Sequence, residues 1–294
     1  MTSAQKRRLR DNLTSYAFLL PSMVIMLTFL VFPILYALYI SFHQWFGILP
    51  PKYIGLENYR RLLQDEAFHA SLKVTGLYAL MVVPTLTFAS LVVAVILNQK
   101  IRFQNLYKGL IYVPVIASAT VVSLIWKWIY NADFGILNWL MSALGLPERI
   151  WLGDTRLALP SIALMAIWQS LGYYMVMYFA GLQSIPPQLP EAAEIDGASR
   201  LQIFWHITVP LLRPVMLMVI VMATIGSFQV FDAVYVMTFG GPANSTSSIV
   251  WLIYQKAFVA FQMGSASAMG IILFLVIFAI SIIELHVLRQ KFEY

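Results

Sequence analysis

Six long runs of apolar residues, none of them containing Asp, Glu, Lys or Arg, constrain this chain more than any other feature. They cover residues 16–42, 74–97, 109–126, 157–182, 214–231 and 263–283. A bilayer core is about 30 Å thick, and roughly 20 apolar helical residues cross it. The chain of 294 residues is 60% hydrophobic and 11% charged, which excludes a soluble globular enzyme and a disordered protein. The sequence therefore predicts an integral membrane protein.

The runs predict helices, because they are continuous and lack the period-two alternation of membrane barrels. Lipid offers no hydrogen-bond partners, so each segment must satisfy its own backbone amides. The fifth run continues past one acid, Asp232, to Phe239. Interior prolines such as Pro114 are expected to kink these helices. We expect an all-α polytopic protein with six transmembrane helices, in which residues 1–294 form a single transmembrane domain.

Basic residues give the expected orientation. A cluster at residues 6–10 directly precedes the first run, and Lys and Arg are denser in the segments on that side than in those opposite. Positive residues favour the cytoplasmic side of a membrane. Both termini are therefore expected in the cytoplasm, and the segments 43–73, 127–156 and 232–262 outside. Residues 56–70 in the first outer segment predict a short amphipathic helix, which would either meet an external partner or lie on the membrane.

The segment 183–214, on the expected cytoplasmic side, is predicted to fold into a defined structural element with a functional role. Pro186 and Pro187 should end the fourth transmembrane helix, because proline lacks the N–H group. Residues 189–195 predict a short helix that Gly197 stops, since glycine adopts the left-handed conformation at low cost. Ser199 is suited to cap a second helix that runs into Pro210 and the fifth span. The expected result is a pair of short helices at a sharp bend.

This bend has two readings on chemical grounds alone. Ala192 and Ala193 are small enough for a partner to approach closely, and Glu191, Glu194 and Asp196 offer an acidic face for Arg or Lys. The segment would then bind another protein and transmit that protein's movements to the membrane helices. The other reading is a folded interfacial loop without a partner, and the residues do not decide between the two.

The same segment resembles the signature loop of permease subunits in ATP-binding-cassette importers. The pattern is Glu-Ala-Ala, three residues, Gly, nine residues and Ile-x-Leu-Pro, and residues 191–210 match every spacing. The landmarks are Glu191, Ala192, Ala193, Gly197, Ile207 and Pro210, with Val209 in place of Leu. The resemblance implies that the coupling loop, residues 186–210 with Asp196 among its contacts, docks into a cleft of a cytoplasmic ATPase.

Other stretches are similar to one group within that family. Residues 55–59, 183–186, 227–232 and 240–242 resemble carbohydrate-importer permeases of the maltose, oligosaccharide and glycerol-phosphate group, and residues 243–258 resemble the first of two permease types that pair. The resemblance implies the type I importer permease fold in the cytoplasmic (inner) membrane of a prokaryote. The implied partners are a second homologous permease, two copies of a cytoplasmic ATP-binding subunit and an extracytoplasmic solute-binding protein.

The chain lacks the motifs of an enzyme or a cofactor site. There is no phosphate-binding G-x-x-x-x-G-K-[ST] sequence, no H-E-x-x-H and no Cys, and the four His are scattered. We expect no catalytic residue, no metal and no bound cofactor. ATP would be hydrolysed by partner subunits, which the docking loop would couple to this chain.

Polar and aromatic side chains in the fourth and fifth spans are candidates for the transport path. A sugar site needs groups that pair with hydroxyls and aromatic faces that stack on a pyranose, and polar groups within spans are costly without a role. Position-by-position resemblance selects Trp168, Gln169, Ser170, Tyr173, Ser227 and Gln229. The other reading is that these side chains bridge helices or belong to the interfacial aromatic belt.

Two other function classes fit the sequence less well. A secondary transporter or channel that needs no ATPase would show coupling acids deep in the bundle, and the predicted spans offer only Asp232, which directly follows the fifth run near an expected outer end. A membrane-embedded enzyme would need clustered His or acids within spans. The expected function is a sugar-importer permease that forms half of the translocation path, and the solute could be an oligosaccharide, a simpler sugar or glycerol phosphate.

Overall fold

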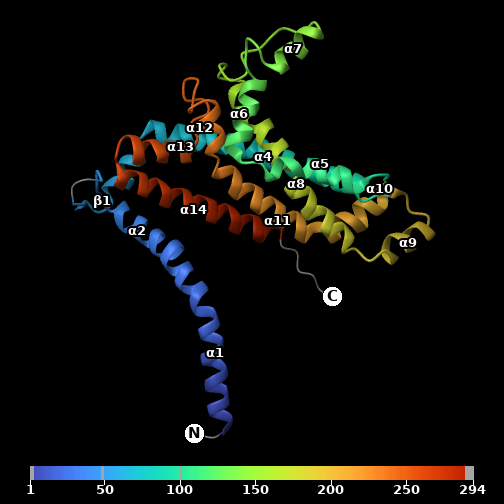
Figure 1. Cartoon of the computed structure of the whole chain (residues 1–294), viewed down its shortest axis with the longest axis horizontal. Helices are drawn as coiled ribbons and strands as arrows, with labels where there is room; N and C mark the ends of the chain where they lie inside the picture. Colours follow the sequence, from blue (N-terminus) through green and yellow to red (C-terminus); the bar gives the residue numbers. More distant parts are fainter. Residues whose placement is uncertain (1–2, 48–49, 100, 289–294) are drawn as a thin grey trace. The chain divides into compact units, whose positions relative to one another are not determined.

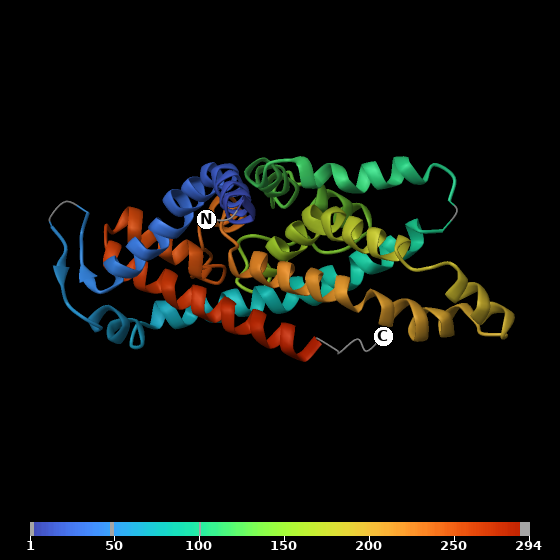
Figure 2. The same ribbon diagram turned by 90° about the horizontal axis from the view of Figure 1, so that it is seen from below.

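The computed structural model describes residues 3–47, 50–99 and 101–288, and nearly all of its elements are helices (Figures 1 and 2). This confirms the predicted all-α class; the single departure among the described residues is a pair of two-residue strands. The contacts group into two compact units. One unit comprises residues Met1–Gln64 and Ile253–Ile272, and the other comprises Asp65–Leu252 and Leu273–Tyr294.

The first unit begins with a long apolar helix made of three successive segments: α1 (Ser3–Met26), the π-helical η1 (Leu27–Val31) and α2 (Phe32–Ser41). Pro33 lies at the start of α2, directly after η1. Proline cannot donate a backbone hydrogen bond, and a wide π turn is one way in which a helix accommodates it. The stretch Thr14–Ser41 is long and apolar enough to cross a membrane, as the first run predicts.

The same unit continues with a small group of elements held together by polar contacts. Strand β1 (His43–Gln44) pairs antiparallel with β2 (Lys52–Tyr53), and α3 (Glu57–Leu62) follows. Asn58 in α3 is buried, and its Nδ2 donates to the carbonyl oxygens of Ser41 at 2.8 Å and of His43 at 2.9 Å. One amide side chain thus ties the end of α2 and the start of β1 to α3.

The prediction of one helix over residues 56–70 is wrong, because the chain forms two. Helix α3 ends at Leu62, and α4 (Glu66–Leu97) begins after Asp65. The Asp65 carboxylate accepts hydrogen bonds from two free N–H groups in the first turn of α4, at 2.9 and 3.3 Å. An N-cap of this kind starts a new helix, whereas the prediction weighed only the apolar face.

The second unit is built around α4. This helix packs along α8 (Ala158–Gln183) and α11 (Val209–Phe228), and α5 (Gln104–Ile116) packs on the other side of α8. Its contact faces carry small residues, and Ser90 and Ala94 are fully buried. Small side chains allow close approach of helices in lipid, where packing replaces the hydrophobic drive.

The third run does not form one helix, and the prediction of a continuous third span is wrong in this respect. Helix α5 ends at Ile116, and α6 (Ala119–Ile129) leaves it at an angle of 98°. Ala117 and Ser118 between them have extended backbone. The described residues contain five helices able to cross a membrane, or six if α5 and α6 count as one broken span.

The fifth run is also interrupted. Helix α11 ends at Phe228, and α12 (Asp232–Met237) begins after a three-residue break. The stretch Arg200–Met237 still forms one candidate membrane span, which confirms that the fifth span continues past Asp232. The segments beyond the two breaks pack on each other. Lys127 in α6 donates from its Nζ to the carbonyl oxygen of Val236 in α12 at 3.0 Å. This bond joins the segments that follow the breaks in two different spans.

The remaining elements connect the spans. Helix α7 (Ile136–Ala143) lies between α6 and α8, and α13 (Ile249–Tyr254) with the π-helical η3 (Gln255–Val259) leads to α14 (Met263–Leu288). The buried N–H of Ile249 donates to Thr75 Oγ1 in α4 at 2.9 Å. A side chain in the second span thereby satisfies the otherwise free first amide of α13.

Candidate functional site

The predicted coupling loop folds as two helices around one tight turn. Helix α9 (Gln188–Ile195) has Asp196 as its C-cap, and Gly197 follows with a left-handed φ of +82°. The N–H of Ala198 donates to the carbonyl oxygen of Ala193 at 2.9 Å, a bond that closes the end of α9. The turn therefore depends on glycine at the position that the sequence selected.

The second arm of the loop begins with a reciprocal cap. Ser199 Oγ accepts from the N–H of Gln202, and the N–H of Ser199 donates to Gln202 Oε1 at 2.8 Å. From this cap the chain stays helical through α10 (Arg200–Ile203) and the π-helical η2 (Phe204–Thr208) into α11. The predicted helix start at Ser199 and the uninterrupted passage through Pro210 are both confirmed. We call residues 186–210 the elbow.

The elbow presents an acidic and apolar outer surface. Glu191, Glu194 and Asp196 are exposed, and within the described ranges they form no ion pair. Ala192 is exposed and Ala193 half-buried. Ile195 is 87% exposed, an unusual state for a large apolar side chain and one that the sequence reading missed.

A hollow of about 380 Å³ lies in the bend between the two arms. It brings together Ala193, Asp196 and Ile207 of the predicted residues, along with Gln202 and His206. Glu191, Ala192, Gly197 and Pro210 are outside this lining. The arrangement offers a partner a small concave surface that includes one carboxylate, that of Asp196.

Two of the four predicted path residues of α8, Trp168 and Gln169, lie at the break between α5 and α6. Gln169 Nε2 donates to the carbonyl oxygen of Ala117 at 3.3 Å, which satisfies a carbonyl that the end of α5 leaves free. The Trp168 ring lies 5.4 Å, centroid to centroid, from that of Trp126 in α6. Tyr173 is exposed and meets Tyr174 edge-on. Ser170 is half-buried.

The two path residues of the fifth span lie at the other break. Gln229 is exposed at the C-terminal cap of α11, next to the start of α12. Ser227, two residues earlier, is only 4% exposed and faces the bundle in this arrangement. The six predicted residues thus lie along two helices, with Gln169 and Gln229 at the two interruptions.

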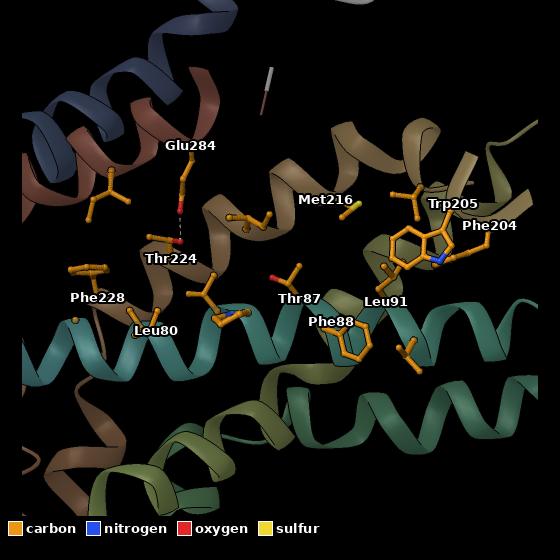
Figure 3. A pocket seen from close by; sticks show the side chains of 18 of the residues that line it. Leu80, Thr87, Phe88, Leu91, Phe204, Trp205, Met216, Thr224, Phe228 and Glu284 are labelled. Atoms are coloured by element: carbon orange, nitrogen blue, oxygen red, sulfur yellow. Dashed lines mark hydrogen bonds between the residues drawn. The ribbon is translucent and has the colours of Figure 1, made fainter. Parts of the chain in front are cut away.

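A larger cavity of about 850 Å³ lies elsewhere in the second unit, between α4, η2, α11 and α14 (Figure 3). Its lining is almost entirely apolar and includes Phe88, Trp205 and Met216, but none of the six predicted path residues. Such a surface suits hydrocarbon better than a sugar, which needs several hydrogen-bonding groups.

The cavity contains one acid that the sequence reading missed. Thr224 Oγ1 donates to Glu284 Oε1 at 2.7 Å, and among the described residues Glu284 Oε2 has no hydrogen-bond partner although it is buried. Glu284 directly follows the sixth apolar run, which by definition stops at the first charge, while α14 continues to Leu288. Within the described ranges, no three side chains of His, Asp or Glu gather as metal ligands would.

The sequence matches a known family over most of its length. Residues 75–292 match the family described as "Binding-protein-dependent transport system inner membrane component". The chain is 35% identical to the probable ABC transporter permease protein YurN of Bacillus subtilis, over 97% of this chain and 99% of that protein. It is 33% identical to the trehalose/maltose transport system permease protein MalF of Thermococcus litoralis, over 97% of each.

Similarity extends to another curated protein and to solved structures. The chain is 31% identical to the multiple sugar-binding transport system permease protein MsmF of Streptococcus mutans, over 98% of this chain and 99% of that protein. A chain in the crystal structure of a bacterial ABC transporter involved in import of the acidic polysaccharide alginate matches with a TM-score of 0.87 and 23% identity, over 99% of this chain and 100% of that chain. The fold is that of an ABC importer permease.

Proposed function

The chain belongs to the binding-protein-dependent transport system inner membrane component family, and from this membership we propose that it is the permease subunit of an ATP-driven importer whose solute is a sugar. Membership makes it a multi-pass transport permease of the inner membrane, and it favours this function over a secondary transporter or channel. A sugar is the expected solute because relatives of this chain are named transport system permeases for trehalose and maltose and for multiple sugars.

The structure of the elbow is the main support for the proposal that this chain is coupled to ATP hydrolysis by a partner subunit. Its residues 191–210 carry the family pattern, its carboxylates are exposed, and its second arm is continuous with α11. We infer that Glu191, Ala192, Ala193, Asp196, Gly197, Ile207 and Pro210 form the contact with a cytoplasmic ATPase. Because α10, η2 and α11 form one helical rod, a displacement of the elbow reaches the fifth span without a loose joint.

The other partners follow from the same proposal. A second homologous permease would complete the translocation path, two copies of an ATP-binding subunit would hydrolyse ATP, and an extracytoplasmic solute-binding protein would deliver the sugar. The chain itself would bind no cofactor. Both termini and the elbow would face the cytoplasm, in agreement with the basic cluster at residues 6–10.

A charge reversal at the elbow tests this function. Glu191→Lys should weaken association with the ATPase by roughly tenfold to a hundredfold, because a charge-assisted contact contributes about 1.5–3 kcal/mol. ATP-driven uptake into vesicles should fall in parallel. Both are measured on the complex coexpressed with its second permease and its ATPase, with the ATPase retained on the tagged chain as the binding readout.

Glu148→Lys is the matched control, since Glu148 is an equally exposed acid in the predicted outer segment. It should leave ATPase association and uptake as they are in the unmodified complex. Uptake that persists in Glu191→Lys vesicles without any ATPase present would instead favour a secondary transporter and end the proposal.

We further propose that Trp168, Gln169, Ser170, Tyr173, Ser227 and Gln229 line the sugar path. The support is their chemistry, the exposure of Trp168, Tyr173 and Gln229, and the location of Gln169 and Gln229 at the two helix breaks. Buried Ser227 would reach the path only when the spans move. Aromatic faces and amide groups together suit a pyranose, which has both an apolar face and a rim of hydroxyls.

Removing single path side chains should lower transport without dissociating the complex. Gln229→Ala and Tyr173→Ala are each expected to raise the sugar concentration for half-maximal uptake about two- to tenfold, since one lost neutral hydrogen bond costs about 0.5–1.5 kcal/mol. Tyr107→Ala, at an exposed tyrosine of α5, is the control. If Gln229→Ala and Tyr173→Ala break up the complex, these residues are packing residues and the path assignment fails.

A further inference from the structure

Helices α6 and α7 carry a surface that neither the elbow nor the proposed path uses. Helix α6 leaves α5 at 98°, so it runs close to the membrane plane if α5 runs along the membrane normal (Figure 1). Its inner side is anchored: Val122 and Ser123 are buried, and Trp126 packs against Trp168. The opposite side faces away from its own unit.

Both helices expose an apolar stripe at helical spacing. In α6 the exposed residues are Val121, Leu124, Ile125 and Trp128, and in α7 and its C-cap they are Ile136, Trp139, Leu140 and Leu144. The steps of three and four residues place each set on one face. Trp128 is 67% and Trp139 is 68% exposed. A helix in water shows the reverse pattern, with its apolar stripe turned to the core.

The α7 segment is held in a defined structure by hydrogen bonds. Asn138, 4% exposed, donates from Nδ2 to the carbonyl oxygens of Ala132 at 3.0 Å and Arg149 at 2.9 Å. Its Oδ1 accepts from the N–H of Arg149 at 3.2 Å and from Trp151 Nε1 at 2.8 Å. Every hydrogen-bonding position of this amide is therefore occupied, and the apolar stripe is held outward.

The same network ties α7 to the end of a membrane-crossing helix. Trp151 packs against the Tyr130 ring at 6.0 Å, and Tyr130 OH donates to the carbonyl oxygen of Ser161 in the first turns of α8 at 3.0 Å. Helix α8 is itself apolar and long enough to cross the bilayer. The chain of contacts fixes α7 near the level at which that crossing begins, the level where tryptophan is enriched in membrane proteins.

The chemistry of the exposed face favours lipid over a protein partner. Residues 134–147 contain no charged side chain, and Asp133, Glu148 and Arg149 flank them. Lys127, the one cation of α6, turns back to bond Val236. A protein interface carries about one hydrogen bond per 100–200 Å², whereas this face offers apolar carbon and two indole rings.

We propose that the exposed faces of α6 and α7 form a ledge that rests in the headgroup–acyl boundary of the phospholipid leaflet on the side where this segment emerges. Trp128 and Trp139 sit at the boundary, and the aliphatic residues of both stripes enter the acyl region, as in interfacial helices. The ledge supports α12 through the Lys127–Val236 bond. This inference depends on membrane insertion alone and holds whichever solute the protein carries.

This chain contains no cysteine, so a single introduced thiol is the only site on it that a spin label can modify before it is assembled with its partners. Trp139→Cys and Leu140→Cys are labelled in the full chain, assembled in its complex in vesicles of phosphatidylcholine and phosphatidylglycerol. Collision with oxygen, which concentrates in lipid, is compared with collision with a water-soluble nickel chelate. Glu148→Cys, on the charged flank, is the matched control.

We expect oxygen to dominate at residues 139 and 140 and the nickel chelate to dominate at residue 148. Access of the nickel chelate to both stripe positions would mean that they face water, and shielding from both reagents would mean that a protein covers them; either result overturns the proposal. Uptake measured on the same vesicles keeps the tests separate. Loss of ATP dependence with lipid contact intact would count against the proposed function and leave the ledge standing.

Discussion

Replacing Gly264 with alanine is expected to destabilise the first unit by about 3 kcal/mol, the upper end of the usual cost of overpacking. A Cβ atom on Gly264 would overlap the carbonyl oxygen of His43 and lie 3.1 Å from Asn58 Nδ2. The same His43 oxygen accepts a hydrogen bond from Asn58 Nδ2. The extra methyl group would therefore push apart α14, β1 and α3 at a point where backbone has no room to yield.

The matched control is Gly270→Ala on the same helix, because no atom lies within 4 Å of the added Cβ there. Alanine should be neutral or stabilise by about 0.4–1 kcal/mol, since glycine loses more backbone entropy on folding. Stepwise heating of the purified protein in detergent, followed by size-exclusion chromatography, measures both. Equal melting of the two variants would show that α14 does not lie against His43.

The second large effect is expected for Gly172→Ala, which should separate α5 from α8. The new Cβ would overlap the carbonyl oxygen of Ile111 and lie 2.9 Å from the Cα of Tyr112, both of them backbone atoms. Gln169 lies one turn before Gly172 on α8 and bonds the end of α5. We expect a loss of about 3 kcal/mol of stability together with loss of sugar uptake.

Gly109→Ala serves as the control for this contact, because Gly109 lies in α5 with no atom within 4 Å of an added Cβ. It should retain the melting temperature and the uptake of the unmodified complex. Normal uptake by Gly172→Ala would contradict the close approach of α5 and α8. A variant that melts normally but no longer transports would place the effect on the helix break and not on folding.

The elbow could be predicted from sequence because its structure is local. Paired prolines end a helix, Gly197 accepts a positive φ, and Ser199 caps the next helix within three residues. Each of these preferences acts over one turn of chain. The predicted positions of α8 and α14 also hold, since a long uncharged apolar run leaves few alternatives in lipid.

The two breaks could not be predicted, because their partners are distant in sequence. The free carbonyl of Ala117 is satisfied by Gln169, 52 residues away, and α12 is held by Lys127, 109 residues from Val236. Hydropathy reports whether a segment is apolar and says nothing of the angle at which it runs. The position of Glu284 within the last helix was not predicted because the sixth apolar run was defined to end at its first charged residue, which is Glu284 itself.

The bond between Lys127 and Val236 has a mechanical consequence. A break between two helices ordinarily leaves the segment beyond the break free to move alone. The Lys127–Val236 bond and the packing of α6 on α12 join the segments beyond the two breaks to each other. A displacement of α11 that moves α12 is therefore expected to move α6 as well.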